Sequence, residues 1–307
     1  MASKRNKTIT LNTTEIELFS AEALRPEMLP EGFAPDRLCL GNMEAVCPLL
    51  PRESVSLAIV DPPYNLSKHY GESDFHHKND EDYRAFTVSW IEKLLPLLKK
   101  NATVYVCSDW KTSLLIAPIL ARYFHIQNRI TWQREKGRGA AKNYKNAMED
   151  IWFCTLSDDY TFHTDRVKLR RRVLAPYREN GKAKDWKEGD GTPYRDTCPS
   201  NFWDDITIPY WSMEENTPHP TQKPEKLLAK LILASSEEGD LVFDPFLGSG
   251  SSAVTAKKLN RRFFGIERER EYIALAIKRL RLADRNKRIQ GYEDGIFYHR
   301  NYKPNHQ

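Results

Sequence analysis

The chain has 307 residues, of which 40% are hydrophobic, enough to bury the core of one large domain with an inserted or appended subdomain. It has no run of about eighteen apolar residues, and its basic start lacks an apolar segment, so we expect neither a transmembrane helix nor a secretory signal. The five cysteines form no Cys-x-x-Cys pair, which is typical of reduced thiols in the cytoplasm. The net charge of +5 favours polyanionic partners only mildly.

Predicted strands and helices alternate along most of the chain. Strands are predicted at 37–42, 56–60, 103–107, 129–132, 150–156, 240–244 and 262–267, from short apolar and β-branched runs. Helices are predicted at 83–100, 110–124, 224–236, 251–259 and 268–287, from apolar residues at helical spacing. This alternation predicts an α/β fold with a parallel, doubly wound, Rossmann-like sheet.

Composition divides the chain into five parts. Residues 1–36 are irregular and contain three prolines, so we expect an N-terminal arm. Residues 163–216 mix basic, aromatic, glycine and proline residues without a period, which indicates an inserted, mostly irregular functional segment. Between and after these lie two halves of one domain, 37–162 and 217–290, and a C-terminal tail, 291–307.

Basic residues concentrate in the middle of the chain. Nine lie between Arg166 and Lys187, against only two acids, and a second basic run lies at 129–146. Solvated loops are the plain interpretation of one such run, but two runs with interleaved aromatic residues favour nucleic acid as the partner. The candidate nucleic-acid-binding residues are Arg138, Lys142, Lys168, Arg170, Arg171, Arg172, Lys182 and Lys184.

A glycine turn follows the strand at 240–244. Gly248 and Gly250 precede a predicted helix, where glycines let backbone approach a ligand closely. Glu267 ends the next strand, a position suited to ribose hydroxyls. A dinucleotide site is a rival, because Ala253 tolerably replaces its third glycine. Asp244 before the turn weakens that rival, because a carboxylate suits a ligand's ammonium group better than a pyrophosphate.

A second strand, 56–60, ends in an acid, two prolines and a tyrosine, "DPPY" at Asp61 to Tyr64. The prolines must end the strand, because proline lacks the backbone donor and fixes φ. In an open sheet, ligands bind beyond the carboxyl ends of the strands. If this strand neighbours the strand at 240–244, Asp61 and Gly248 face the same crevice.

Three segments together resemble a known family. "DPPY", "DPFLGSG" at Asp244 to Gly250 and "HPTQKP" at His219 to Pro224 are similar to the catalytic and S-adenosylmethionine motifs of DNA amino-methyltransferases. The order, catalytic motif first and cofactor motif last, resembles the beta class, whose motif order is circularly permuted. In the short strand before them, Gly41-Asn42 replaces the family's Gly-Asp, which puts a contact to the cofactor's adenine in doubt, although an amide oxygen can still accept that bond.

The resemblance implies roles for the matching residues. The cofactor-binding candidates are Asn42, Asp61, His219, Thr221, Gln222, Lys223, Asp244, Pro245, Phe246, Gly248, Ser249, Gly250, Ser251, Glu267 and Arg268; the catalytic candidates are Asp61, Pro62, Pro63 and Tyr64. Asp61 and the Pro62 carbonyl would accept hydrogen bonds from an exocyclic amine, Pro63 would keep the turn rigid, and Tyr64 would stack on a base flipped out of the duplex.

The implied function is site-specific methylation of the adenine N6 amine in double-stranded DNA with S-adenosylmethionine. The enzyme would act in a restriction–modification system beside a cognate endonuclease, or alone. A homodimer and a cytoplasmic location fit the resemblance, and no membrane partner is expected. N4-cytosine or RNA amine methylation is the near alternative. A non-catalytic DNA-binding protein on the same fold is the alternative from another class, disfavoured by the intact motif at Asp61.

Overall fold

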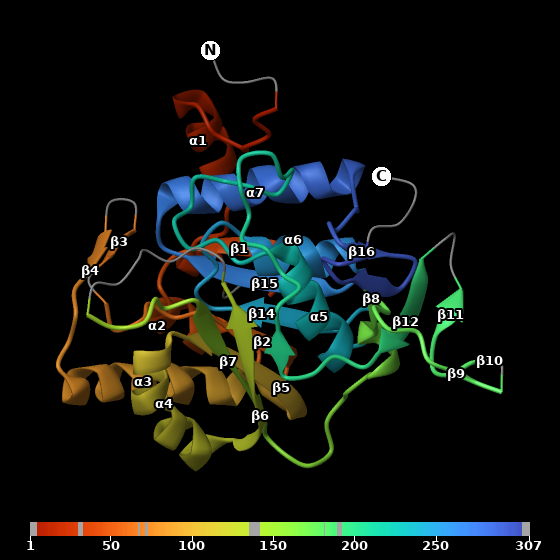
Figure 1. Cartoon of the computed structure of the whole chain (residues 1–307). Helices are drawn as coiled ribbons and strands as arrows, with labels where there is room; N and C mark the ends of the chain where they lie inside the picture. Colours follow the sequence, from red (N-terminus) through yellow and green to blue (C-terminus); the bar gives the residue numbers. More distant parts are fainter. Residues whose placement is uncertain are drawn as a thin grey trace.

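The computed structural model describes residues 5–29, 33–66, 68–70, 73–134, 142–180, 182–188 and 192–302, with backbone alone for 68–70, 73–75 and 183. Its centre is an eight-stranded sheet in the order β1-β15-β14-β2-β5-β7-β6-β13 (Figure 1). The strands are β1 (Arg37–Leu40), β2 (Val55–Val60), β5 (Leu98–Ser108), β6 (His125–Gln133), β7 (Met148–Thr155), β13 (Phe202–Trp203), β14 (Leu241–Asp244) and β15 (Arg262–Glu267).

The sheet is parallel from β1 to β5 and mixed beyond β5. β7 runs antiparallel to both β5 and β6, whereas β13 pairs parallel with β6. The expectation of an entirely parallel sheet is therefore wrong at this edge. The described residues between β6 and β7, 134 and 142–147, contain no crossover helix, and a direct connection between neighbouring strands reverses the chain direction.

Helices cover both faces of the large sheet, which confirms the doubly wound α/β architecture. Along β2, Leu57 and Ile59 face one hydrophobic core, while Ala58 and Val60 face the other, as the two-residue period of a strand requires. The first core is closed by α5 (Glu225–Ser235), α6 (Ser251–Lys258) and α7 (Arg270–Arg285), and the second by α2 (Met43–Val46), α3 (Asp80–Leu94) and α4 (Trp110–Tyr123). None of the described helices is long and apolar enough to cross a membrane.

β2 and β14 are neighbours in the sheet and run parallel, with Leu57 opposite Val242 and Ala58 opposite Phe243. Both strands therefore end at the same edge. This pairing confirms that Asp61 and the turn at Gly248 face one crevice despite their distance in the sequence.

A second, five-stranded sheet has the order β11-β12-β8-β17-β16 (Figure 1). Its strands are β8 (Leu169–Arg172), β11 (Lys187–Glu188), β12 (Pro193–Thr197), β16 (Tyr292–Glu293) and β17 (Ile296–Tyr298). Two separate two-stranded ribbons form, one from β3 (Lys68–Tyr70) with β4 (Ser73–Phe75) and one from β9 (Arg178–Glu179) with β10 (Lys182–Ala183). Segment 163–216 thus combines short strands with irregular connections. The segment at 292–298, predicted to be a separate tail, completes its sheet.

Helix α5 lies between the two sheets. One side packs into the core of the large sheet through Leu227 and Leu231, and the other packs with Leu169 and Phe297 of the small sheet through Leu233. All its residues are consequently buried, including three charged ones. A helix buried on all sides is unusual for a sequence with two lysines, and their charges need partners inside the protein.

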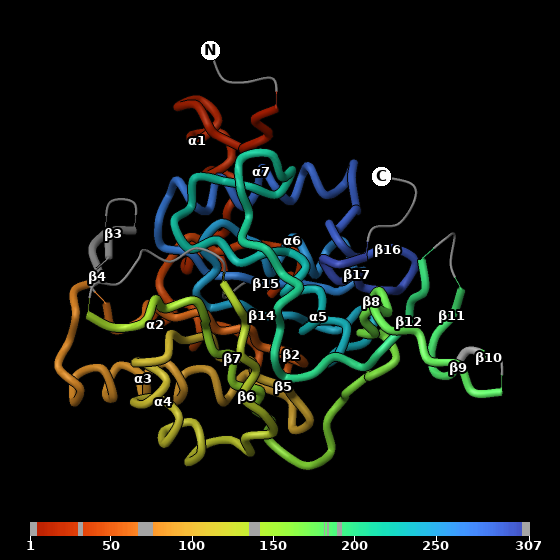
Figure 2. Tube along the Cα trace, in the orientation of Figure 1, coloured from red at the N-terminus to blue at the C-terminus, as the bar shows by residue number. Residues whose placement is uncertain are grey.

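The N-terminal arm is more ordered than expected. Residues Thr13–Ser20 form α1, which begins with a capping box between Asn12 and Glu15 and packs on α7. Before it, the Lys7 amide donates to the Trp211 carbonyl over 2.7 Å. The trace in Figure 2 shows this arm meeting the segment that precedes α5 at the same end of the molecule.

Candidate functional site

A cavity of about 750 Å³ lies at the carboxyl edge of the large sheet, where β1, β2, β14 and β15 end. Most of the predicted cofactor and catalytic residues line it. From the sequence predictions the lining includes Asn42, Asp61, Pro62, Pro63, Tyr64, His219, Thr221, Gln222, Lys223, Asp244, Pro245, Phe246, Gly248, Ser249, Ser251, Glu267 and Arg268. His76 and His77, which were not among the predicted site residues, also line it.

The glycine turn shapes one wall of the cavity. Gly248 has φ +56°, and a Cβ there would approach the His219 ring to 3.0 Å, so the absence of a side chain keeps room between turn and imidazole. Gly250, at φ +80°, is not among the lining residues. A Cβ on Gly250 would come within 2.5 Å of the Ala276 Cβ, so this glycine allows α6 to pack against α7 rather than a ligand to approach.

Arg279 of α7 holds the turn from behind. Its side chain is fully buried, and Nη1 donates to the Ser249 carbonyl over 2.8 Å and to the Ser251 hydroxyl over 2.9 Å. Its Nη2 donates to Glu225 over 3.0 Å. The ligand-facing backbone is therefore fixed by a buried cation that the sequence analysis did not single out.

Two buried carboxylates flank the turn. Asp244 accepts hydrogen bonds from the Ser252 hydroxyl and, over 2.9 Å, from the Phe246 amide. Glu267 accepts from the Gly248 amide over 2.7 Å and from the Glu269 amide over 2.8 Å. Burial raises the pKa of both carboxyls to about 7, although these hydrogen bonds oppose the rise. Each carboxylate is thus held in place by the turn that it supports.

Charge along the cavity favours a cationic ligand. Six carboxylates line it, those of Glu44, Asp61, Asp82, Asp244, Glu267 and Glu269, against the cations Lys78, Lys223 and Arg268. S-adenosylmethionine carries a sulfonium and an ammonium group, so the lining fits it. A dinucleotide pyrophosphate would meet an excess of negative charge at the same wall.

Several predicted cofactor residues have a structural task as well. The Asn42 side chain caps α2 by accepting from the Ala45 amide over 2.8 Å. The Gln222 side chain accepts from Thr217 and donates to the Glu215 carbonyl over 2.6 Å. These bonds order the segment before α5, which carries His219 and Thr221 to the cavity.

The catalytic motif forms an elbow after β2. The Tyr83 hydroxyl donates to the Pro63 carbonyl over 2.9 Å, and the Asn65 amide donates to the Thr112 hydroxyl over 3.2 Å. Helices α3 and α4 thereby fix the elbow that the two prolines already restrict. Asp61 is brought to the cavity rim with a side chain that is 20% exposed.

Asp61 belongs to a compact group that we call the cavity cluster: Asp61, Tyr64, Glu149 and Lys223. Lys223 Nζ lies 2.6 Å from Asp61 Oδ2, 3.2 Å from the Tyr64 hydroxyl and 3.5 Å from Glu149 Oε2. The Tyr64 hydroxyl donates to Asp61 Oδ1 over 2.9 Å. Sequence reasoning named three of the members but missed Glu149, which lies on β7.

Electrostatics keep the cavity cluster ionic. Burial alone would lower the pKa of Lys223, but the charges of Asp61 and Glu149 outweigh it and raise that pKa well above its ordinary value. Burial, together with the same two carboxylates, raises the pKa of Tyr64 far above its usual range. Lys223 is therefore an ammonium and Tyr64 a neutral phenol at neutral pH.

The predicted DNA-binding residues fall into different environments. Arg170 is paired with Asp196 through two hydrogen bonds, of 2.7 and 2.9 Å, and stacks on Tyr194 at 4.2 Å, so its guanidinium is held within the small sheet. Arg171 lies 3.7 Å from Asp204, and Lys184 lies 3.1 Å from Glu179. Lys142, Arg172 and Lys182 are exposed, Lys168 is half-buried, and Arg138 lies outside the described residues.

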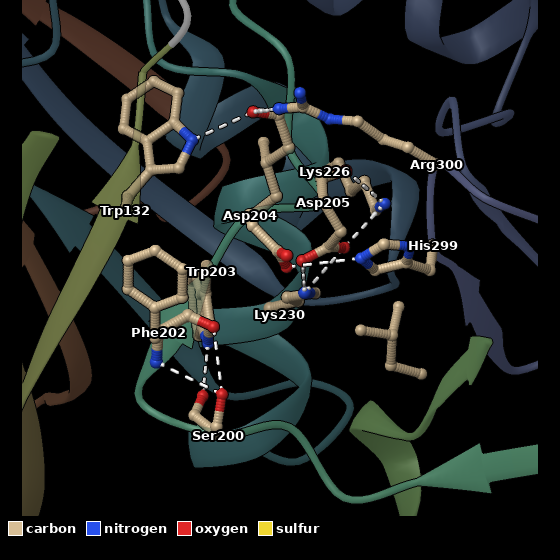
Figure 3. A network of polar contacts seen from close by, with 12 residues as sticks. Trp132, Ser200, Phe202, Trp203, Asp204, Asp205, Lys226, Lys230, His299 and Arg300 are labelled. Carbon is tan, nitrogen blue, oxygen red and sulfur yellow. Dashed lines mark hydrogen bonds and ion pairs between the residues drawn. The ribbon is translucent and has the colours of Figure 1, made fainter. Parts of the chain in front are cut away.

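A second ionic group, the locked cluster, consists of Asp205, Lys226 and Lys230 (Figure 3). Lys230 Nζ contacts both Asp205 oxygens, at 2.7 and 2.8 Å, and Lys226 Nζ lies 2.7 Å from Oδ2. The neighbouring Ile206 carbonyl accepts from Trp132 over 3.0 Å and from Arg300 over 2.9 Å. The cluster thus joins α5, the inserted segment and the C-terminal segment.

Comparison with known proteins places this arrangement in a family. A model of the family described as "DNA methylase" matches residues 55–278. The chain is 36% identical to the type II methyltransferase M.HpaI of Haemophilus parainfluenzae over 80% of its length and 74% of the relative's. It is 32% identical to the DNA adenine methyltransferase YhdJ of Escherichia coli over 79% of its length and 82% of the relative's.

Solved structures share the fold. The cytosine-N4-specific PvuII DNA methyltransferase superposes with a TM-score of 0.59 at 18% identity, over 88% of this chain and 96% of that one. A Thermus thermophilus protein, TTHA0409, crystallised with S-adenosyl-L-methionine, gives 0.52 at 18% identity over 87% and 99%. Together these matches confirm the predicted fold class and the prediction of a DNA-methylating enzyme. Because the family model spans well over half of the chain and both relatives exceed 30% identity, this protein belongs to the DNA methylase family.

Proposed function

We propose that this protein transfers a methyl group from S-adenosylmethionine to the N6 amine of adenine at a specific sequence in duplex DNA. The observation that carries the proposal is the position of Asp61, at the rim of a carboxylate-rich cavity beside the glycine turn. An acceptor for an amine and a place for a cationic methyl donor thus meet at one edge of the sheet.

The chain's own residues prepare the amine. The lone pair of an exocyclic amine is delocalised into the base, so attack on a methyl group requires that lone pair to be localised. Asp61 and the Pro62 carbonyl, accepting hydrogen bonds from the NH2 group, favour a more tetrahedral nitrogen. As positive charge develops on nitrogen, the Asp61 carboxylate stabilises it and takes up the proton, directly or through water.

The bound donor supplies an electrophilic methyl group on a positively charged sulfur. Asp244 suits its ammonium group and Glu267 its ribose hydroxyls, while Gly248 and Ser249 form the wall against which it lies. Asn42 would accept a hydrogen bond from its adenine amine through the second lone pair of the amide oxygen that caps α2. Arg279 keeps this wall rigid.

Recognition of DNA is assigned to the segment at 163–216 and the basic residues around it. The exposed side chains Lys142, Arg172 and Lys182 are suited to phosphates, whereas Arg170 serves the small sheet. Flipping the target base costs a few kcal/mol, which phosphate contacts and stacking on Tyr64 offset. The half-buried ring of Tyr64 lines the cavity beside Asp61.

The cellular setting is inferred from relatives. M.HpaI is named as a type II methyltransferase and YhdJ as an adenine methyltransferase. We therefore infer that the protein acts in the cytoplasm, where bacterial DNA lies. It acts there either within a restriction–modification system beside a cognate endonuclease or as a solitary methyltransferase. A homodimer is part of this proposal, from the resemblance to the beta class.

The test uses tritiated S-adenosylmethionine and unmethylated duplex DNA made by whole-genome amplification. After incubation, the DNA is digested and its nucleosides are separated. We expect label in N6-methyl-2′-deoxyadenosine, and sequencing of the modified sites then gives one recognition sequence. Label confined to N4-methylcytosine, or transfer to RNA alone, contradicts the adenine assignment; DNA binding without any transfer contradicts an enzymatic role.

A further inference from the structure

In the cavity cluster, Lys223 is paired with the Asp61 carboxylate, which the proposed mechanism requires as the acceptor for the target amine. Asp61 Oδ2 already accepts from Lys223 Nζ over 2.6 Å, and Oδ1 accepts from Tyr64 over 2.9 Å. Lys223 is only 8% exposed, so water screens this ion pair little. An ammonium in this place neutralises Asp61 and opposes the positive charge that develops on the nitrogen during methyl transfer.

Glu149 offers Lys223 another partner without a large movement. Its Oε2 lies 3.5 Å from Lys223 Nζ, and its carboxylate is buried, with a side chain 5% exposed. Its Oε1 is held by Arg134, the residue after β6, which leaves Oε2 directed at the lysine. The Tyr64 hydroxyl lies 2.9 Å from Asp61 Oδ1 and 3.3 Å from Glu149 Oε2, so it bridges the two carboxylates.

We propose that Lys223 passes from Asp61 to Glu149 when the target base enters, so that Glu149 is a positioning residue that clears Asp61 for the amine. This inference rests on the proposed function. The ammonium exchanges one charge-assisted hydrogen bond for another and stays buried and paired throughout. No proton is transferred in the exchange, and Asp61 regains its negative charge when the amine needs it.

If Lys223 exchanges partners, a single and a double variant should differ in the rate of methyl transfer in a way that a merely structural ion pair would not produce. With Glu149→Gln, Lys223 loses its second carboxylate and stays on Asp61, so methyl transfer is slow. With Glu149→Gln and Lys223→Met together, one negative and one positive charge are removed, and Asp61 is free. The double variant should therefore be faster than the single variant, although it carries one more change in the site.

The experiment measures single-turnover methyl transfer from tritiated S-adenosylmethionine to amplified, unmethylated duplex DNA. Rates are normalised to the fraction of protein that binds S-adenosylmethionine by calorimetry, so a variant that folds poorly is still measured. We expect Glu149→Gln to be slower than the unchanged enzyme by about tenfold and the double variant to regain at least about threefold. If Lys223→Met prevents cofactor binding, Lys223→Gln takes its place.

A matched control pair lies outside the lining of the cavity. Lys278 of α7 contacts Glu15 of α1 at 2.5 Å, so Glu15→Gln with Lys278→Met repeats the same chemical changes without touching the cavity cluster. This pair should leave the single-turnover rate unchanged. A double cavity variant no faster than Glu149→Gln, or a Glu149→Gln rate equal to that of the unchanged enzyme, overturns the exchange alone. Absence of transfer by the unchanged enzyme overturns the proposed function and the exchange with it.

Discussion

The cavity cluster and the locked cluster both pair buried lysines with carboxylates, and their lysines lie close in sequence. Lys223 precedes α5, whereas Lys226 and Lys230 lie within it. At the cavity, one lysine faces two carboxylates, Asp61 and Glu149, and the side chain of Asp61 is 20% exposed. In the locked cluster, two lysines share the single carboxylate of Asp205, whose side chain is 1% exposed.

In our proposal, this difference separates an ion pair that exchanges partners during catalysis from a structural one. A lysine with two acceptors can exchange partners at small cost, because one charge-assisted bond replaces another. Lys226 and Lys230 share one carboxylate, and among the described residues Lys226 otherwise contacts only neutral acceptors, the carbonyls of Asp205 and Tyr298, so losing that carboxylate would leave two buried charges without a counterion. Burial accordingly lowers the pKa of Lys230 to about 8, despite the attraction of Asp205, while the pKa of Lys223 is raised.

The largest expected effect is a loss of methyl transfer, caused by a substitution in the cavity cluster. Asp61→Ala should reduce methyl transfer by about a thousandfold or more, because the amine loses its charged acceptor. DNA affinity, measured by fluorescence anisotropy, should remain largely intact. Asp284→Ala, which removes a surface carboxylate paired with Lys257 at 2.6 Å, is the control and should leave the rate unchanged. Comparable activity in Asp61→Ala and the unchanged enzyme would refute the mechanism.

The equivalent change in the locked cluster should act on stability. Asp205→Asn leaves Lys226 and Lys230 without a buried counterion, so we expect the free energy of unfolding to fall by about 3–5 kcal/mol. Urea unfolding at neutral pH measures this. Asp61→Asn, the matched substitution at the cavity, should change the free energy of unfolding far less. Equal losses in the two variants would remove the distinction between the clusters.

Lowering the pH should reduce the stabilisation that the locked cluster provides, over a defined range of pH. Burial would raise the pKa of Asp205, but Lys230 and Lys226 outweigh it and lower that pKa from 3.8 to about 2. The stabilisation is therefore complete above the unfolded-state value and is lost as pH falls from about 4 to about 2, a change of about 2 kcal/mol. The difference in free energy of unfolding between the unchanged protein and Asp205→Asn should narrow over this range, and a constant difference would contradict it.

Packing behind the cavity can be tested with two glycines of similar φ. Gly250→Ala places a methyl group 2.5 Å from the Ala276 Cβ at φ +80°, whereas Gly239→Ala at φ +83° meets no atom within 4 Å. Backbone strain is thus common to both. We expect Gly250→Ala to lose roughly 1–3 kcal/mol more by urea unfolding, because only it must displace α7 from α6. It should also weaken S-adenosylmethionine binding; equal losses would assign the effect to backbone strain alone.

The smallest effect compares Arg170, which has a carboxylate partner, with Arg172, which has none among the residues that the structure describes. Arg172→Ala removes an exposed guanidinium, so the slope of log affinity for DNA against log salt should decrease by about 1. Arg170→Ala breaks the pair with Asp196 and should lower the free energy of unfolding, with little change in the slope. The reverse pattern would show that Arg170, not Arg172, contacts phosphate.

Much of the site was predictable, because its residues are adjacent in sequence and act through local geometry. The two prolines fix the elbow after Asp61, and the turn at Gly248 requires glycine in its own backbone. Glu149, Arg279 and Asp205 were not predictable in this way. Each acts on a partner that is far away in the chain, and a single carboxylate or guanidinium in a strand, helix or loop carries no local signal of that partner.

The sequence by itself determined the α/β class, the order of the motifs and the residues at the carboxyl ends of β2 and β14, since periodicity and turn chemistry are local properties. Only the tertiary structure decided that β2 lies beside β14, that the segment at 292–298 joins the sheet of the inserted segment, and that α5 is buried between two sheets. It also decided which ion-pair partners three similar lysines have. Lys223 faces a cavity and has two carboxylates nearby, whereas Lys226 and Lys230 are buried and share one carboxylate. The reason is that tertiary packing determines which charged groups lie close enough to pair.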